Sequence, residues 1–528
     1  MNKKTFFTVI VVLIALTALT KLLSTVFLEP WVGNKMEAMV NEGNEDFTIE
    51  IDKVHISMIR REIQFSGIHI ESKGIHQANT GFSGSIASIK CTGIKLLKAI
   101  FNNDIDIREI TITNANIKGT MPFSGGAKKP MLSPANIRLG KLQFVQLNLA
   151  INNTASAQAY AVKKGDVTFH DLQIEKKDAI STSIIQEFDF EADEILFVSA
   201  DSMYTYKSSG LKYSHTSGTM SADSFFIQPN YENYDFTSRY KYETDRIEAS
   251  FSSISVHDFS AMHYLKSKSL MSSFIEIGQM EINVFRDKQK PFKHVNKTAF
   301  QDLIYNYPGD LHIDSIELIN GNLIYTEHAE KANKPGSISF NNIQAKILKV
   351  TNDKIYKTKK DFLVISGQAL LMGKGKMTIL LKGEIYDPEN TFLLSGTLSD
   401  MQVKALNPML EKNAFVYVNS GKVDAMNFSL IANNTQARGK MTMLYHALDL
   451  TVKNKQTDDT TALKEQIISF LANKKVIDAN PVSGKEARAG TIVYIRDPEK
   501  SLFNYCFKAI WSGMKSSLTK SSKDKKNT

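Results

Sequence analysis

The sequence is poor in cysteine and in proline. The only two cysteines, Cys91 and Cys506, lie near opposite ends of the 528-residue chain. A disulfide framework is therefore excluded, and a single bridge is not expected. Twelve prolines are few for this length. Because proline cannot donate to a strand ladder, its scarcity favours long strands.

Excess positive charge is small outside the C-terminal tail. The chain has a net charge of +9, and the segment from Lys508 to Thr528 carries +5 of it, from six lysines and one aspartate. This leaves +4 for the rest of the chain, which is too little for a nucleic-acid-binding platform of this size. We therefore expect no nucleic-acid partner.

Recognisable catalytic, phosphate-binding and metal-binding motifs are absent from the sequence. Gly81–Gly84 lacks the spacing of a nucleophile elbow, and Gly373–Lys376 lacks that of a P-loop. The first predicts a strand-end turn and the second a hairpin turn. His257 and His263, six residues apart, match no common ligand pair on a helix. We predict a protein that is not an enzyme and has no metal or cofactor; a carboxylate pair acting on polysaccharide stays open as a third hypothesis.

One long apolar run is present, Phe6–Leu28, broken only by Lys21. As a helix it would be roughly 34 Å long, enough to cross a bilayer. Lys3 and Lys4 precede it, so this end should stay cytoplasmic while the rest is exported. The alternative is a cleaved signal peptide, but the run is long and no small-x-small site precedes Glu29. We predict a retained, single-pass anchor.

A repeated strand pattern organises most of the chain. Ile105–Ile117 and Leu311–Leu323 place apolar residues at the same offsets, in steps of two interrupted by a step of three. Steps of two predict a strand with one apolar and one polar face. The extra residue predicts a bulge or tight bend. Asn114–Asn116 and Asn320–Asn322, at matching positions, have the composition of a turn.

These patterns predict a mainly β fold, an elongated and curled antiparallel sheet with an N-terminal transmembrane helix and a C-terminal amphipathic helix. A helical or loop interruption is expected between two series of strands. The predicted domains are residues 1–30 as the anchor, 31–256 and 310–498 as two halves of a β-groove, 257–309 as the interruption, and 499–528 as the amphipathic helix with a basic tail.

The apolar strand face is the first candidate functional surface. Few helices are available to cover it, so a curled sheet would leave an apolar lining for a chain-like ligand such as an acyl chain. The alternative is a closed β core, filled by its own side chains, in a non-enzymatic envelope scaffold or assembly factor. The candidate lining residues are Ile105, Ile107, Ile110, Ile112, Leu142, Phe144, Leu311, Ile313, Ile316 and Leu318.

The segment Leu502–Leu518 is the second candidate surface, because its apolar residues form one helical stripe with lysines beside it. Two interpretations are open. The helix either contacts an anionic membrane surface or caps the open end of the sheet. The residues assigned to this surface are Phe503, Phe507, Ile510, Trp511, Met514, Lys515 and Leu518.

Three segments share features with one known family. They are Met1–Ile70, with a membrane helix, a linker and the strands that follow; Leu394–Val452, at its steps Leu406–Leu410, Ser420–Val423 and Ala437–Gly439; and Gly490–Leu518, at Arg496–Pro498, Phe503–Tyr505 and Ser512–Lys515. In these segments the chain resembles the AsmA-like superfamily of envelope proteins, which includes TamB-type proteins. The third segment is similar to the tail of an uncharacterised branch of it.

The resemblance implies a β-groove anchored in the inner membrane by one helix, with most of the chain in the periplasm. It also implies that the groove binds or conducts phospholipid acyl chains between the inner and outer membranes. Further expected partners are the outer membrane, or an outer-membrane or periplasmic protein, at the C-terminal helix. No catalytic residues come with the family, so none is transferred to this chain.

Overall fold

The computed structural model describes residues 21–22, 24–42, 47–73, 81–95, 104–121, 136–174, 187–354, 362–452 and 476–519. Within these ranges the chain is mainly β, with 19 strands. It divides into two compact units, Met1–Ser217 and Gly218–Thr528, here called unit 1 and unit 2.

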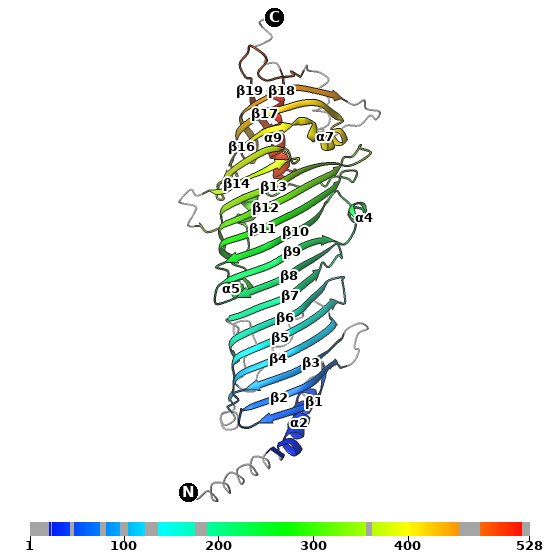
Figure 1. Ribbon diagram of the computed structural model, residues 1–528, viewed down its shortest axis with the longest axis vertical. Coiled ribbons are helices and arrows are strands. Elements are labelled where there is room, and N and C mark those ends of the chain that lie inside the picture. Colours follow the sequence, from blue (N-terminus) through cyan, green and yellow to red (C-terminus); the bar gives the residue numbers. More distant parts are fainter. Residues whose placement is uncertain are drawn as a thin grey trace, which may run out of the picture. The chain divides into compact units, whose positions relative to one another are not determined.

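Unit 1 contains eight strands that pair in sequence order (Figure 1). A π-helix, η1 (Ser24–Leu28), and helix α2 (Glu29–Glu42) precede them. All neighbours are antiparallel except β4 and β5, which are parallel. The strands are β1 (Phe47–Ser57), β2 (Glu62–Ser72), β3 (Gly81–Thr92), β4 (Asp104–Met121), β5 (Asn136–Asn153), β6 (Ala159–Ile174), β7 (Glu187–Val198) and β8 (Tyr204–Ser214).

Unit 2 repeats this arrangement with eleven strands, of which only β11 and β12 are parallel neighbours. The strands are β9 (Thr219–Pro229), β10 (Asp245–His257), β11 (Leu270–Asp287), β12 (Leu311–His328), β13 (Gly336–Thr351), β14 (Leu363–Leu371), β15 (Gly375–Gly383), β16 (Phe392–Gln402), β17 (Val416–Ala432), β18 (Gln436–Val452) and β19 (Ala489–Ile495). The helices are α4 (Asn233–Ser238), α5 (Ala261–Ser267), α6 (Phe300–Tyr305), the 3-10 helix η3 (Val403–Leu406), α7 (Asn407–Asn413) and α9 (Leu502–Leu518).

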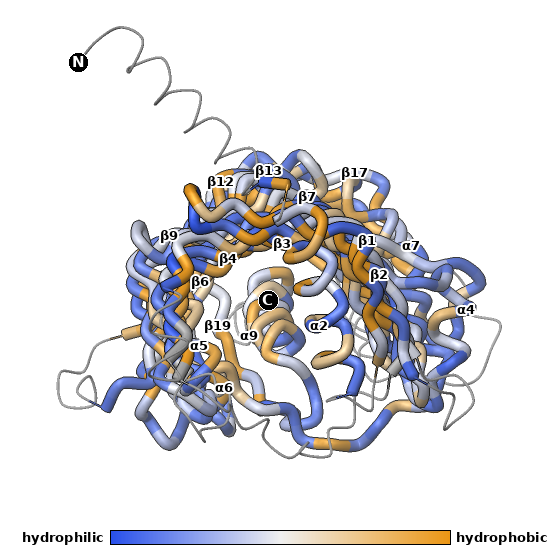
Figure 2. The backbone as a smooth tube through the Cα atoms, turned by 90° about the horizontal axis from the view of Figure 1, so that it is seen from below, coloured by the Kyte–Doolittle hydropathy of each residue, from blue (hydrophilic) through white to orange (hydrophobic). Residues whose placement is uncertain are grey.

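Each sheet curls, and one face of each lies inside the curve. Figure 2 shows α2 inside the curve of the unit 1 strands and α9 inside that of the unit 2 strands. In unit 1 the buried Gly33 of α2 lies against Val54 of β1. In unit 2 Tyr505 and Ala509 of α9 pack into a core with side chains of β15–β19. We call the side that carries these helices the inner face and the opposite side the outer face.

A left-handed residue lies where the first repeat predicted a turn. Asn114 has a φ of 52°, but β4 continues through it to Met121. Gln146, at the equivalent position of the parallel neighbour β5, has a φ of 56°. The pairing of β4 with β3 and with β5 keeps its register through this point, so the left-handed residue changes the local backbone conformation without ending the strand. The predicted turns Asn114–Asn116 and Asn320–Asn322 are therefore wrong, because both lie inside continuous strands.

Helix α2 covers the free edge of β1, whose other edge pairs with β2. The backbone N–H of Ile49 donates to the Asn41 side chain at 2.7 Å, and that of Ile56 donates to the Glu29 carboxylate at 3.0 Å. The carboxylate of Glu37 accepts from Ile51 between them. These donors would otherwise be a template for another strand, so the helix blocks edge-to-edge pairing.

Helix α9 covers the free edge of β19 in the same way. The backbone N–H of Thr491 donates to Ser516 Oγ, and that of Val493 donates to Ser512 Oγ, both at 3.1 Å. The helix approaches closely because both partners are glycine at the contact. A Cβ on Gly490 would lie 2.5 Å from the carbonyl oxygen of Gly513.

Two further expectations are corrected by the structure. The interruption predicted at 257–309 does contain α5 and α6, but it also contains the long strand β11. The hairpin turn predicted at Gly373–Lys376 is confirmed between β14 and β15, whereas Gly81–Gly84 forms the beginning of β3.

In the part of the chain that the structure describes, no helix is long and apolar enough to span a membrane. Most of the predicted anchor, residues 1–20, and the basic tail, 520–528, lie outside the described residues.

Candidate functional site: the inner apolar faces

Apolar side chains follow one another across the inner face of unit 2. Residues that pair across strands lie on the same face of a sheet, so the register itself defines a row. We call it the inner row of unit 2. Its members, each paired with the next, are Val256, Ile275, Ile316, Ile347, Ile365, Leu381, Leu394 and Leu430. A second column beside it contains Ile254, Ile277, Leu318, Ala345, Gly367, Ile379, Gly396 and Phe428.

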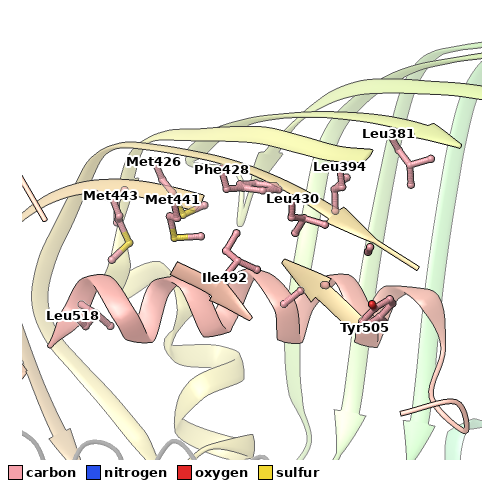
Figure 3. Close-up of a cluster of buried hydrophobic side chains, with 14 of the residues drawn as sticks. Leu381, Leu394, Met426, Phe428, Leu430, Met441, Met443, Ile492, Tyr505 and Leu518 are labelled. Atoms are coloured by element: carbon pink, nitrogen blue, oxygen red, sulfur yellow. The ribbon is translucent and has the colours of Figure 1, made fainter. Parts of the chain in front are cut away.

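Among the described elements, helix α9 seals one end of this row. Leu381, Leu394 and Leu430 are buried beneath it, together with Met441 and Ile492 (Figure 3). From β11 to β14 the row members are instead partly exposed. Ile379, at the border of the sealed region, keeps 37% of its surface exposed. No second sheet packs on this face among the described strands, since every strand of unit 2 belongs to the same consecutive series.

Unit 1 has an inner row of the same kind. Its paired members are Val54, Phe65, Ile89, Ile112, Phe144, Val167, Phe190 and Tyr213. A small buried cluster of Ile68, Ile86 and Ala115 lies next to it. Most row members are partly exposed, and only Tyr213 is buried. Unit 1 therefore also presents a continuous apolar strip that none of its described helices or strands seals along its length.

Aromatic rings extend the apolar lining of unit 1 across β6, β7 and β8. The rings of Tyr160 and Phe197 stack at 4.9 Å between centroids, and Phe197 stacks on Tyr206 at 5.6 Å. Phe188 contacts the ring of Tyr213 at 5.2 Å. Such pairs add about 0.5–1.5 kcal/mol beyond area burial, so they stiffen the strip as well as widening it.

Within each unit, several of the lining residues predicted from the sequence lie side by side. Ile112 and Phe144 are members of the inner row of unit 1, and Ile110 and Leu142 pair beside them. Ile316 and Leu318 take the corresponding places in unit 2.

Four predicted lining residues lie elsewhere or fall outside the description. Leu311 and Ile313 are buried at the beginning of β12, so they do not line an open surface. Ile107 is partly exposed, as the row members are, but it pairs with the buried Leu139 and lies outside the inner row. The backbone of Ile105 pairs with Ile137, but its side chain lies outside the described residues.

Several lining residues were not singled out from the sequence. Ile347, Ile365 and Phe190 belong to strands that were recognised by their alternation. No repeat motif marks these residues, so nothing distinguished them from ordinary strand positions. The available signal was cross-strand register, which needs the pairing order of the strands.

A connecting segment, Lys288–Ala299, passes along the inner side of unit 2. Because β11 and β12 are parallel, the chain must return along the full strand length between them. The segment is fastened to the residues between β19 and α9. The Lys297 N–H donates to the Pro498 carbonyl at 2.8 Å, and His294 Nδ1 lies 2.9 Å from Glu499 Oε2. We call this segment the strap.

Charged groups lie half-buried around the strap. Lys500 Nζ sits 3.2 Å from the centre of the Phe292 ring. Burial lowers the pKa of the Lys500 and Lys508 ammonium groups and raises the pKa of the Glu243 carboxyl. Lys288 is paired with Glu327 at 2.7 Å. This arrangement offers polar groups beside the apolar row, but it contains no nucleophile with an adjacent base.

The C-terminal helix uses most of its predicted stripe for internal packing. Ile510 and Met514 contact the core, and Leu518 is buried in it. Trp511 packs instead against Ala414 and Val416. Lys515 is half-buried, whereas Phe503 and Phe507 remain exposed. Capping of the sheet by this helix is therefore confirmed, and membrane contact stays a prediction that these two phenylalanines could serve.

The outer face of unit 2 carries an open hollow of about 840 Å³ over β12–β17. Its polar side chains bond to each other across strands, as Lys346 does with Glu317 and Thr378 with Thr397. Within the described ranges no group of three or more His, Cys, Asp or Glu residues could hold a metal ion. The hollow therefore shows ordinary strand-to-strand pairing.

No protein-family model matches the chain, and no curated protein matches it either. The geometry of the two inner faces is therefore what supports a function.

Proposed function

We propose that the inner faces bind the acyl chains of phospholipids and conduct them between the inner and outer membranes, in a membrane-anchored periplasmic protein of the AsmA-like type. One observation carries this proposal. Ile275, Ile316, Ile347 and Ile365 stand in direct register on adjacent strands, yet remain partly exposed. Contiguous apolar surface of this kind marks a binding site in soluble domains.

The chemistry of the inner rows fits an acyl chain better than a compact ligand. Burial of methylene groups is non-directional and contributes about 0.8 kcal/mol per CH₂. A long aliphatic strip therefore gains affinity with contact length and needs no precisely placed polar partner. The half-buried Lys500 and Lys508 beside the strap are suited to the negatively charged end of such a lipid.

A second candidate function is that of an envelope scaffold with a closed core. The observation that favours it is the sealed cluster beneath α9, where Leu430, Met441 and Ile492 are almost fully buried. If the strands β9–β14 were also closed in solution, no guest would enter.

The two functions are separated by a charge placed at Ile365, a partly exposed member of the row that packs against the edge of the core sealed by α9. Ile365→Asp points an ionised carboxylate into the inner face of β14, and Ser366→Asp places the same charge on its outer face as a matched control. The full chain is purified in mild detergent, and its bound lipid is measured by native mass spectrometry and extraction. We expect phospholipid on the wild type and on Ser366→Asp, and a loss of fivefold or more on Ile365→Asp.

Thermal unfolding of the same samples shows whether a loss of lipid reflects a loss of folding. A sealed core would make Ile365→Asp unfold, by several kcal/mol, without any lipid on the wild type. The absence of co-purifying phospholipid from folded wild-type protein would count against lipid binding and in favour of the scaffold.

A further inference from the structure

The outer face of β16–β19 exposes large aliphatic side chains. The exposed fractions are 44% for Leu393, 55% for Ile431, 56% for Val493 and 78% for Ile495. Leu393 pairs directly with Ile431, and Arg438 pairs with both Ile431 and Val493. The four aliphatic residues therefore lie on neighbouring strands of one face, and we call them the outer patch.

Cations without acidic neighbours in register surround the outer patch. Lys382 pairs with Leu393, and Lys440 pairs with Ser429 and Thr491. Arg438 donates from Nε to Gln436 at 2.9 Å. These three exposed cations form no ion pair with any described residue, and none of the residues that pair with them is Asp or Glu.

Elsewhere the outer faces carry cross-strand ion pairs, although single aliphatic side chains such as Leu380 are exposed there too. Lys346 pairs with Glu317 and Lys212 with Glu191, each across adjacent strands. Cross-strand pairs of opposite charge are the usual way in which a solvated sheet face is built. In place of such pairs, the outer patch has aliphatic residues and charges of one sign. Exposing this combination to water alone is energetically unfavourable.

We propose that the outer patch docks onto the surface of an anionic lipid bilayer. The four aliphatic side chains would enter the boundary between headgroups and acyl chains, while Lys382, Arg438 and Lys440 meet anionic headgroups. An exposed sheet face with branched aliphatic residues and long cations suits a bilayer. A protein partner of similar size would be expected to find an aromatic anchor or a pocket, and the outer patch has neither among its members. This inference is independent of whether the inner faces bind acyl chains.

The test uses the full chain carried in nanodiscs of neutral phosphatidylcholine. It is mixed with vesicles that contain phosphatidylglycerol or with vesicles of phosphatidylcholine alone, and co-flotation is measured. We expect flotation with the anionic vesicles only, weakened by added salt. Each neutralised cation should weaken binding roughly fivefold, so Lys382→Gln with Lys440→Gln should weaken it by more than tenfold.

A matched pair of aliphatic variants tests the apolar contribution. Val493→Asp with Ile495→Asp should abolish flotation, whereas Ile324→Asp, at a residue of unit 2 outside the patch with 40% exposure, should leave it unchanged. Equal binding of both vesicle types, absence of binding by the wild type, or equal loss with Ile324→Asp would each overturn the proposal.

A second measurement does not depend on the folding of the charged variants. A polarity-sensitive dye attached through Ile495→Cys should shift to the blue on addition of the anionic vesicles. The same dye attached through Ile324→Cys should not shift. An unchanged spectrum at position 495 would exclude insertion of the outer patch.

Discussion

At the scale of single residues, the two cysteines are protected by their surroundings. Both are free thiols, and burial raises the pKa of Cys91 to about 11 and that of Cys506 to about 12. The thiolate is the reactive form, so at neutral or mildly basic pH almost none is present in the folded chain.

We therefore predict slow modification of both thiols. At pH 8 an aromatic disulfide reagent should react with the folded protein about 100-fold more slowly than with protein in guanidinium. The sign of the pH effect follows from linkage, because a folded pKa above the unfolded value means that folding retains a proton. The thiols should contribute stability that is complete below about pH 9 and is lost as the pH rises through 11. Equal reaction rates in the folded and unfolded protein would show that the thiols are accessible.

Residue alternation predicts which face a side chain takes but does not predict what covers it. Ile316 and Leu318 lie on the same face of the sheet, as their period of two predicts. Leu311 and Ile313 follow the same period but are buried at the beginning of β12, where Asn352, from the end of β13, accepts from the Leu311 N–H at 2.8 Å. Asn352 lies 41 positions further along the chain, so this contact is contained in no local pattern.

At the scale of elements, α9 shows the same division between local and non-local information. Its bounds were predicted because its apolar residues repeat with a helical period. Which side of the helix faces the sheet could not be predicted, because Ile510 and Phe507 are both apolar. Packing against β18 and β19 decides that Ile510 contacts the core and that Phe507 stays exposed. Strand β11 was missed for a related reason, because short helices on both sides made the whole segment resemble an interruption.

The close approach of α9 to β19 gives a prediction for this element. A Cβ on Gly513 would lie 2.7 Å from Ile492 Cγ1, so Gly513→Val should push the helix away from the sheet. Overpacking of this kind costs about 1–3 kcal/mol of unfolding free energy. Phe507→Val, on the exposed side of the same helix, controls for the β-branched residue.

Denaturant unfolding and binding of a hydrophobic dye would measure this effect. The dye should bind Gly513→Val, because the core beneath the helix becomes accessible, and should not bind Phe507→Val. Equal stability of the two variants would mean that α9 is not held against β19 in solution.

At the scale of the whole molecule, each unit carries its own inner row, and the two rows were built by the same strand pattern. The proposed function therefore predicts lipid contact in both units. A photoreactive amino acid at Ile112 or Phe190 in unit 1, and at Ile365 in unit 2, should form adducts with phospholipid on illumination in membranes. The outer-face positions Thr111 and Ser366 are the controls and should give none. Adducts confined to one unit would limit the lipid path to that unit.

The repetitive make-up of the inner rows has a consequence for movement. Branched aliphatic residues recur on strand after strand, at a spacing of about 4.8 Å. A guest displaced by one strand would lose one set of contacts and gain a nearly equal set. The free energy of the bound guest would then change little along the row, with only low barriers between successive positions. Such a nearly level path allows a tightly held molecule to slide without being released into water.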